Sequence, residues 1–235
     1  MPDLSRRSLL LTGGAAALGA GLLTGAAPAS ASSPRTEEPA VTPAAALARL
    51  LAGNRRFVSG HARHPHQTLA DLHEVAAGQH PFAITIGCAD SRVSPEFLFD
   101  QGLGDLFDNR VAGNIVDDLL LGSIEFAVEE FGSPLIVVLG HERCGAVTAT
   151  IDAIESGAGA PGHIGTIVDA LRPIVEPELS RPGDVVDNAV RANIRAQAAQ
   201  LTARSELLAE HVRAGELRIV GARYDLDTGR VALVR

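Results

Sequence analysis

The chain of 235 residues contains no lysine and no tryptophan, and only one tyrosine and two cysteines. All twenty basic residues are therefore arginine, a bias that we attribute to the source genome because no mechanism requires it. Acidic residues are in excess, and the formal charge of −8 argues against nucleic acid or an anionic membrane as a partner. After the N-terminal region no run reaches the roughly eighteen apolar residues of a membrane span, so we expect none in the mature chain.

Residues 1–31 have the pattern of a twin-arginine export signal. The pair Arg6-Arg7 precedes an apolar stretch rich in Ala and Gly, and Ala29-Ser30-Ala31 is a small-residue cleavage site. An uncleaved N-terminal anchor is the alternative, and the glycine content and the cleavage motif argue against it. We therefore expect export through the twin-arginine pathway, to a secreted, periplasmic or cell-envelope location.

After the signal we expect a disordered linker at 32–41, rich in Ser, Pro and Glu, and a single domain at 42–235. Buried-strand patterns alternate there with helical periodicity. This order predicts an α/β fold with a mostly parallel central sheet of four to five strands flanked by helices. The expected strands are 82–86, 105–109, 135–139, 217–222 and 230–234, and the expected helices are 43–60, 69–77, 95–100, 117–131, 144–154, 164–175 and 184–211.

Both cysteines lie in short polar motifs that directly follow a predicted strand. Cys88 opens the first motif, and His141 and Cys144 belong to the second. Because the carboxyl ends of parallel strands meet at the edge of a sheet where ligands bind, we expect these three side chains to converge. Two thiols and one imidazole suit zinc, and three protein ligands leave a fourth position open, as in catalytic zinc sites. The sequence therefore predicts one Zn²⁺ per chain.

A disulfide between the two cysteines is the alternative, because exported proteins commonly contain them. The spacing of His141 and Cys144 favours a metal instead. Export after folding, which a twin-arginine signal implies, would also allow a metal to be loaded in the reducing cytoplasm.

Two charged residues of the first motif are placed to act at the open coordination position of the metal. Asp90 lies two residues after Cys88, close enough to meet the metal or its water, and Arg92 follows two residues later. A guanidinium binds a carboxylate in a two-point fork. With Asp90 held by Arg92, zinc would keep its water and Asp90 could take the proton; with Asp90 on zinc, the site would be closed. A zinc-bound hydroxide would be the nucleophile. A structural ion pair is the alternative, and it is compatible with catalysis.

The pattern C-x-D-S-R, followed about fifty residues later by H-x-x-C-G, resembles the β-class carbonic anhydrases. The segment Asn109 to Asn114 is similar to the R-N-x-x-N stretch of that family, and the resemblance covers nearly all of 42–235. It implies reversible hydration of carbon dioxide to bicarbonate and a proton by a homodimer or a tetramer. It also implies that Cys88, His141 and Cys144 are zinc ligands and that Asp90 and Arg92 are the catalytic pair.

The resemblance further suggests four substrate-binding residues. Gln79 matches a glutamine with which one subgroup, whose resting state is open, orients its substrate, and Gly145 matches a position whose backbone N–H faces the pocket. Phe107 falls at an aromatic pocket wall, and Phe126 falls where the partner subunit supplies a tyrosine. The alternatives are a solvated loop for Gln79 and ordinary core packing for the two phenylalanines.

Other interpretations remain open at this point. His61, His64 and His66 suggest a second metal site, but no carboxylate or cysteine stands beside them, which favours a solvated loop. His163 and His211 are expected at a helix start and a helix end. A related enzyme acting on carbon disulfide or carbonyl sulfide would use the same metal, and a non-catalytic binding protein would have no need of a carboxylate over an open metal position.

Overall fold

The computed structural model describes residues 41–235, so the expected export signal and all but the last residue of the expected linker lie outside the described residues. The described part contains a five-stranded sheet in the order β2-β1-β3-β4-β5. The first four strands in this order are parallel and β5 is antiparallel, which confirms the predicted fold class. The strands are β1 (Ala83–Gly87), β2 (Leu106–Arg110), β3 (Leu135–His141), β4 (Arg218–Tyr224) and β5 (Val231–Val234).

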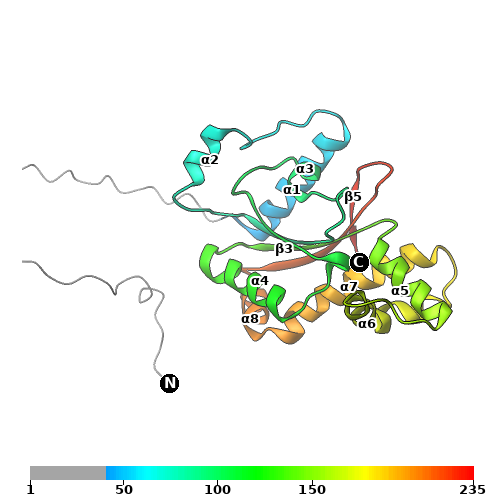
Figure 1. Ribbon diagram of the computed structural model, residues 1–235. Helices are drawn as coiled ribbons and strands as arrows, with labels where there is room; N and C mark the ends of the chain where they lie inside the picture. The colour runs from blue at the N-terminus through cyan, green and yellow to red at the C-terminus, as the bar shows by residue number, and fades with distance from the viewer. Residues whose placement is uncertain (1–40) are drawn as a thin grey trace, which may run out of the picture. The chain divides into compact units, whose positions relative to one another are not determined.

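Helices cover both faces of this sheet. In Figure 1, α1 and α3 lie on one face and α4, α7 and α8 lie on the other. The helices are α1 (Pro43–Val58), α2 (Leu69–Val75), α3 (Pro95–Leu98), α4 (Asp118–Phe131), α5 (Gly145–Ser156), α6 (Ile164–Val175), α7 (Val185–Arg204) and α8 (Glu206–Ala214), with short 3-10 turns η1 (Ala112–Asn114) and η2 (Glu176–Glu178).

The expected helix 184–211 is wrong as a single element, because it is divided at Ser205 into α7 and α8. Ser205 has an extended backbone, and its side chain accepts a hydrogen bond from the Leu208 N–H at 3.1 Å. A serine hydroxyl in that position satisfies a free N–H at the start of a new helix and so competes with continuation of the old one. The other expected strands and helices are present with shifted ends, and β3 runs two residues further than expected, to His141.

The two central strands, β1 and β3, are buried along their whole length. Successive side chains of a strand point to opposite faces. Ile84 and Ile86 therefore join the core under α4, α5 and α7, while Val137 and Leu139 join the core under α1 and α3. Burying one such side chain contributes about 1.5–3 kcal/mol. This two-sided burial fixes where the two polar motifs leave the sheet.

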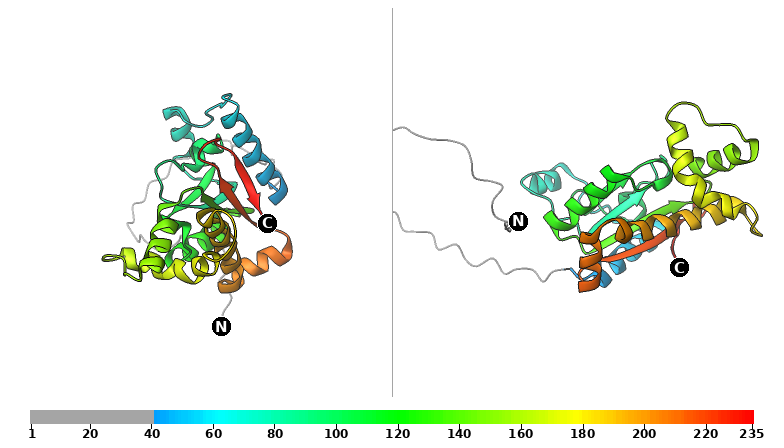
Figure 2. Two further views of the ribbon diagram at one scale, coloured as in Figure 1. Left: turned by 90° about the vertical axis from the view of Figure 1, so that its right-hand side faces the viewer. Right: turned by 90° about the horizontal axis from the view of Figure 1, so that it is seen from below.

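The helices α5 and α6 pack on each other and extend past one end of the sheet (Figure 2). The helix α5 follows β3 after a three-residue connection, so its amino end lies at the carboxyl edge of the sheet. Between residues 41 and 235, no helix combines the length and the apolar character that crossing a membrane requires.

Candidate metal centre

Cys88, His141 and Cys144 converge at the carboxyl edge of the sheet, as predicted. The parallel pairing of β1 with β3 sets Gly87 beside Leu139, so Cys88 and His141 leave neighbouring strands. Cys144 is the residue before α5. The possible ligand atoms of the three side chains all lie within 4.8 Å of one another, and all three residues are buried.

The imidazole of His141 is oriented by the backbone beside it. Its Nδ1 lies 2.8 Å from the Glu142 carbonyl oxygen. A carbonyl can only accept, so Nδ1 carries the proton and Nε2 is left with a free lone pair. Nε2 is buried and has no hydrogen-bond partner. A histidine whose other nitrogen is bound to a carbonyl in this way is typical of a metal ligand.

The two cysteines are free. Their sulfur atoms are 4.0 Å apart, about twice the S–S bond length of about 2.05 Å, so the disulfide alternative is wrong. The Cys144 thiol beside Cys88 lowers the pKa of Cys88, and the same contact, together with burial, raises the pKa of Cys144. The pair therefore favours one thiolate even before a cation adds its own attraction.

Backbone N–H groups also surround the two sulfur atoms. The Gly113 N–H donates to Cys88 Sγ at 3.4 Å. The N–H groups of Ala146 and Val147, in the first turn of α5, act to lower the pKa of Cys144. Two buried sulfur atoms, of which Cys88 favours the thiolate form, and one buried, unpartnered imidazole nitrogen fit a zinc ion.

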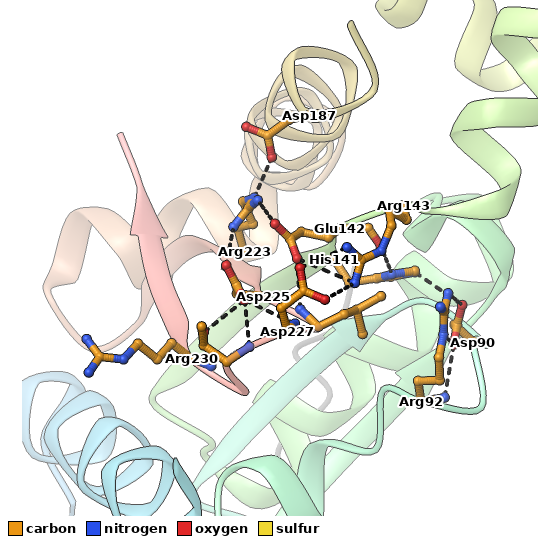
Figure 3. Close-up of polar contacts among 12 residues, drawn as sticks. Asp90, Arg92, His141, Glu142, Arg143, Asp187, Arg223, Asp225, Asp227 and Arg230 are labelled. Carbon is orange, nitrogen blue, oxygen red and sulfur yellow. Dashed lines mark hydrogen bonds and ion pairs between the residues drawn. The ribbon is translucent and has the colours of Figure 1, made fainter. Parts of the chain in front are cut away.

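Asp90 and Arg92 form the expected pair at the mouth of this cluster (Figure 3). The Arg92 side chain donates to both carboxylate oxygens at 2.9 and 2.7 Å, and its backbone N–H donates to Oδ1 at 2.9 Å. These bonds hold the pKa of Asp90 well below its usual range. Asp90 Oδ2 is 3.9 Å from His141 Nε2. The carboxylate is therefore ionised, held by Arg92 and close to the ligand cluster.

Arg110 braces the loop that carries this pair, a role for which the sequence analysis gave no assignment. Its Nε donates to the Cys88 carbonyl at 3.0 Å, and its Nη2 donates to the Asp90 carbonyl at 2.6 Å. Arg110 is the last residue of β2 and lies beside Gly87 in the sheet. The signals in the sequence are its place directly after the predicted strand 105–109 and within the segment that resembles the R-N-x-x-N stretch, and neither reveals its partners.

A network of charged residues holds the turn between His141, at the end of β3, and Cys144, just before α5 (Figure 3). The Glu142 carboxylate pairs with Arg223, which also binds Asp187 of α7, and it accepts from the Leu226 N–H at 3.0 Å.

Arg143, between the same two ligands, has a left-handed backbone with φ of +51°. Its guanidinium binds Asp227 at 3.0 and 2.7 Å. This network could not be predicted from the sequence, because its partners come from distant segments.

The proposed pocket residues divide into two groups. Gly145 is the first residue of α5 and adjoins the cluster. Gln79 is exposed in the loop before β1, at the opposite end of that strand from Cys88. Phe107 pairs with Ile84, four residues before Cys88 and thus about 13 Å away along the strand. Phe126, on α4, is 54% exposed. Within one chain, Gln79, Phe107 and Phe126 do not join the ligand cluster.

The remaining histidines have structural contacts. His66 Nδ1 lies 2.9 Å from Asp105, in the expected loop, and within residues 41–235 the cluster of Cys88, His141 and Cys144 alone has metal-site geometry. His163 begins α6, as expected. His211 lies in the last turn of α8, where its ring contacts Glu129 and Glu216, both at 2.8 Å.

Comparison with known proteins gives one consistent result. A family model described as carbonic anhydrase matches residues 83–231. Carbonic anhydrase 2 of Mycobacterium tuberculosis is 45% identical over 199 residues, covering 83% of this chain and 94% of that protein. A carbonic anhydrase of Mycolicibacterium smegmatis is 43% identical over 199 residues, covering 83% and 95%. The solved Coccomyxa β-carbonic anhydrase in complex with acetazolamide has a TM-score of 0.62 at 29% identity, covering 80% of this chain and 86% of that chain.

Proposed function

The chain belongs to the β-class carbonic anhydrase family, zinc enzymes that hydrate carbon dioxide reversibly to bicarbonate and a proton, and on this premise we propose how its own residues act. Cys88, His141 and Cys144 hold one zinc ion per chain, and Asp90 and Arg92 form the catalytic pair. One observation carries this proposal: the buried, unpartnered Nε2 of His141 lies 3.9 Å from Asp90 Oδ2, and the possible ligand atoms of His141 and the two cysteines lie within 4.8 Å of one another.

A zinc ion held there would supply a Lewis acid that lowers the pKa of a water molecule towards about 7. Two thiolates and a neutral imidazole from this chain donate more charge than three imidazoles do. Because that donation makes the decrease in the pKa of the water smaller, we expect hydration activity to be still increasing above neutral pH.

Asp90 is the group positioned to accept a hydrogen bond from the reacting water. Since Arg92 keeps the pKa of this carboxyl low, Asp90 is ionised and a weak base near neutral pH. It therefore orients the water through Oδ2 by accepting a hydrogen bond, and the proton goes to solvent water instead of staying on Asp90. This refines the expectation that Asp90 itself takes up the proton. Both carboxylate oxygens are bonded to Arg92, which corresponds to the open state, in which Asp90 would not bind the metal.

The pocket is completed by a second copy of the chain. Gln79, Phe107 and Phe126 lie away from the cluster of their own chain, and an exposed phenylalanine is costly to leave in water. Phe126 packs edge-on against Phe131, with ring centroids 5.6 Å apart, and Leu119 on the same helix is 87% exposed. We therefore assign this apolar surface of α4 to a homodimer, in which Phe126 of the partner subunit lines the pocket.

The site of action is outside the cytoplasm. This part of the proposal rests on the twin-arginine pattern at residues 1–31 and on the small-residue segment that ends it. Fusion of residues 1–31 to a reporter that is exported only when folded tests it. Export that is lost when Arg6 and Arg7 are changed to Gln supports the proposal, and export that persists overturns it.

A direct assay on zinc-loaded protein tests the proposed roles. We expect stopped-flow hydration of carbon dioxide with one zinc per chain, and no such activity in Cys88→Ser. Hydrolysis of carbon disulfide or carbonyl sulfide, measured on the same preparation, tests the alternative electrophiles. Protein that is folded, contains no zinc after reconstitution and hydrates nothing would overturn the assignment of the three ligands.

A further inference from the structure

We propose that Asn193 and Gln197 of α7 are positioning residues for Cys88, acting through the Gly113 segment that follows β2. The inference rests on the proposed zinc function, because it concerns how one ligand of that site is held. Both residues lie far from Cys88 in the sequence, and neither contacts the ligand cluster directly.

The two amides stand out on the inner face of α7. The buried residues of this helix are apolar apart from these two: Ala189, Val190, Asn193, Ile194, Gln197 and Leu201. Asn193 and Gln197 are each 1% exposed. A buried amide is costly unless it is hydrogen-bonded, so two of them, one helical turn apart, need partners.

The partners form one continuous chain that leads to the loop beside Cys88. Gln197 Oε1 accepts from the Val116 N–H at 2.9 Å, and Gln197 Nε2 donates to Asn193 Oδ1, also at 2.9 Å. The second bond fixes which way the Asn193 amide faces. Asn193 Nδ2 then donates to the Gly113 carbonyl at 2.8 Å and to Asn114 Oδ1 at 3.3 Å. All the bonds that Asn193 and Gln197 make outside the helix end on residues 113–116.

Gly113 connects this chain to the metal ligand. Its carbonyl is held by Asn193, and its N–H donates to Cys88 Sγ at 3.4 Å. The backbone has φ of +77°, and a Cβ at this position would lie 3.0 Å from Leu171 and 3.2 Å from Ala146. The segment therefore depends on glycine for its shape and on α7 for its position, and together they aim one N–H at the sulfur.

An N–H that donates to a thiolate stabilises the sulfur lone pair and reduces the charge that the sulfur gives to a metal. If α7 no longer held Gly113, the N–H would move away from Sγ and Cys88 would become a stronger, less fixed donor. A purely structural role for the two amides would instead affect folding stability alone. The two roles therefore differ in what they do to the bound metal.

The test compares Asn193→Leu and Gln197→Met with Asn54→Leu in the full chain. Asn54 is a matched control, since it is 5% exposed and bonds the backbone of Leu98, Gly229 and Val231 in the core under α1. Zinc affinity is measured by competition with a chelator. Cobalt is substituted for zinc, and the sulfur-to-cobalt charge-transfer absorption is recorded.

We expect both α7 variants to lose about 10–100-fold in zinc affinity, the usual effect of removing a residue that supports a metal ligand. The charge-transfer band should move to longer wavelength, because the sulfur electrons are less stabilised. The Asn54 variant should lose stability and change neither quantity. If Asn193→Leu does not fold, Gln197→Met decides, because it leaves Asn193 in place while removing the bonds to Asn193 Oδ1 and to the Val116 N–H.

Folded α7 variants with wild-type zinc affinity and an unmoved cobalt band would overturn the inference. So would an Asn54 variant that shifts the band equally, since the effect would then follow from lost stability. A failure of the zinc assignment itself is distinguishable, because the wild-type protein would then bind neither metal at the two sulfurs.

Discussion

The guanidinium of Arg92 lies in a two-point fork on the carboxylate of Asp90, with Nε–Oδ1 and Nη2–Oδ2 distances of 2.9 and 2.7 Å. A third bond, from the Arg92 backbone N–H to Oδ1 at 2.9 Å, closes the ring between the two residues. Asp90 is only slightly exposed, whereas half of the Arg92 side chain reaches solvent. The carboxylate is thus fixed from the solvent side while its other edge faces His141.

This geometry predicts that Asp90→Asn keeps the metal and loses most of the turnover. The neutral amide attracts the proton of the reacting water far less than a carboxylate does, and help of this kind typically contributes about 10²–10⁴-fold. Zinc content and stopped-flow carbon dioxide hydration are measured together. Asp169→Asn, an exposed position on α6, is the matched control and should keep wild-type activity. A variant at Asp90 with full turnover would refute the role of the pair.

Removal of one ligand should abolish zinc binding. His141→Ala leaves two sulfurs and no imidazole, and Cys88→Ser replaces a soft ligand by a hydroxyl that zinc binds poorly. Zinc per chain, measured by atomic absorption after dialysis, should fall from one towards zero in each variant. Near-normal zinc content in either variant would mean that the metal is held elsewhere.

The ligand set could be predicted from the sequence because each ligand belongs to a local pattern. Cys88 and His141 follow apolar runs that can only be buried strands, and Cys144 is three residues from His141. The contacts that support them could not be predicted. Asn193 lies 80 residues from Gly113, and Arg223 lies 81 residues from Glu142, so these bonds exist only once α7 and β4 have packed on β3. The division at Ser205 was missed for a local reason, since a capping serine and a mid-helix serine look alike in sequence.

Asp108 on β2 should make stability depend on pH. Burial raises its pKa to about 6, against 3.8 for the unfolded chain, although the Thr85 hydroxyl donates to it. The folded state therefore binds the proton more tightly, so its advantage is present below about pH 4 and is lost as the pH rises through about 6. The rise of the pKa from 3.8 to about 6 corresponds to about 3 kcal/mol.

Asp108→Asn should consequently be more stable than the wild type at pH 8, by up to about 3 kcal/mol, and no more stable at pH 4. Urea unfolding at several pH values measures the difference, with Asp169→Asn, at an exposed position, as the control. A flat difference for Asp108→Asn would show that this carboxyl titrates normally in the folded protein.

Gly113→Ala should destabilise the protein and weaken the metal site together. The left-handed φ of +77° and the 3.0 Å approach to Leu171 both oppose a side chain there. We expect a loss of about 1–3 kcal/mol in the free energy of unfolding, the usual cost of such strain. Gly122→Ala, on α4 where an added methyl meets nothing within 4 Å, is the control. Equal effects of the two substitutions would contradict the special position of Gly113.

Phe126→Glu should shift the protein from dimer to monomer. A carboxylate in an apolar contact surface is desolvated without a partner, which costs several kcal/mol. Sedimentation velocity measures the change, and turnover should fall in parallel because the pocket would lose its second wall. Asp169→Asn, exposed on α6, should leave the assembly intact. A Phe126→Glu variant that sediments as the wild type would remove α4 from the interface.

The hydrogen bond from His141 Nδ1 to the carbonyl oxygen of Glu142 affects how the site binds a metal ion. The ring is tied to its own backbone, so it cannot rotate freely about its side-chain torsions while the protein remains folded. Its conformational entropy is lost during folding, before any cation arrives. The imidazole is therefore already oriented when a metal ion arrives, and this ligand needs little rearrangement. The rate of metal binding then depends on access to the site and on the release of protons from the ligands.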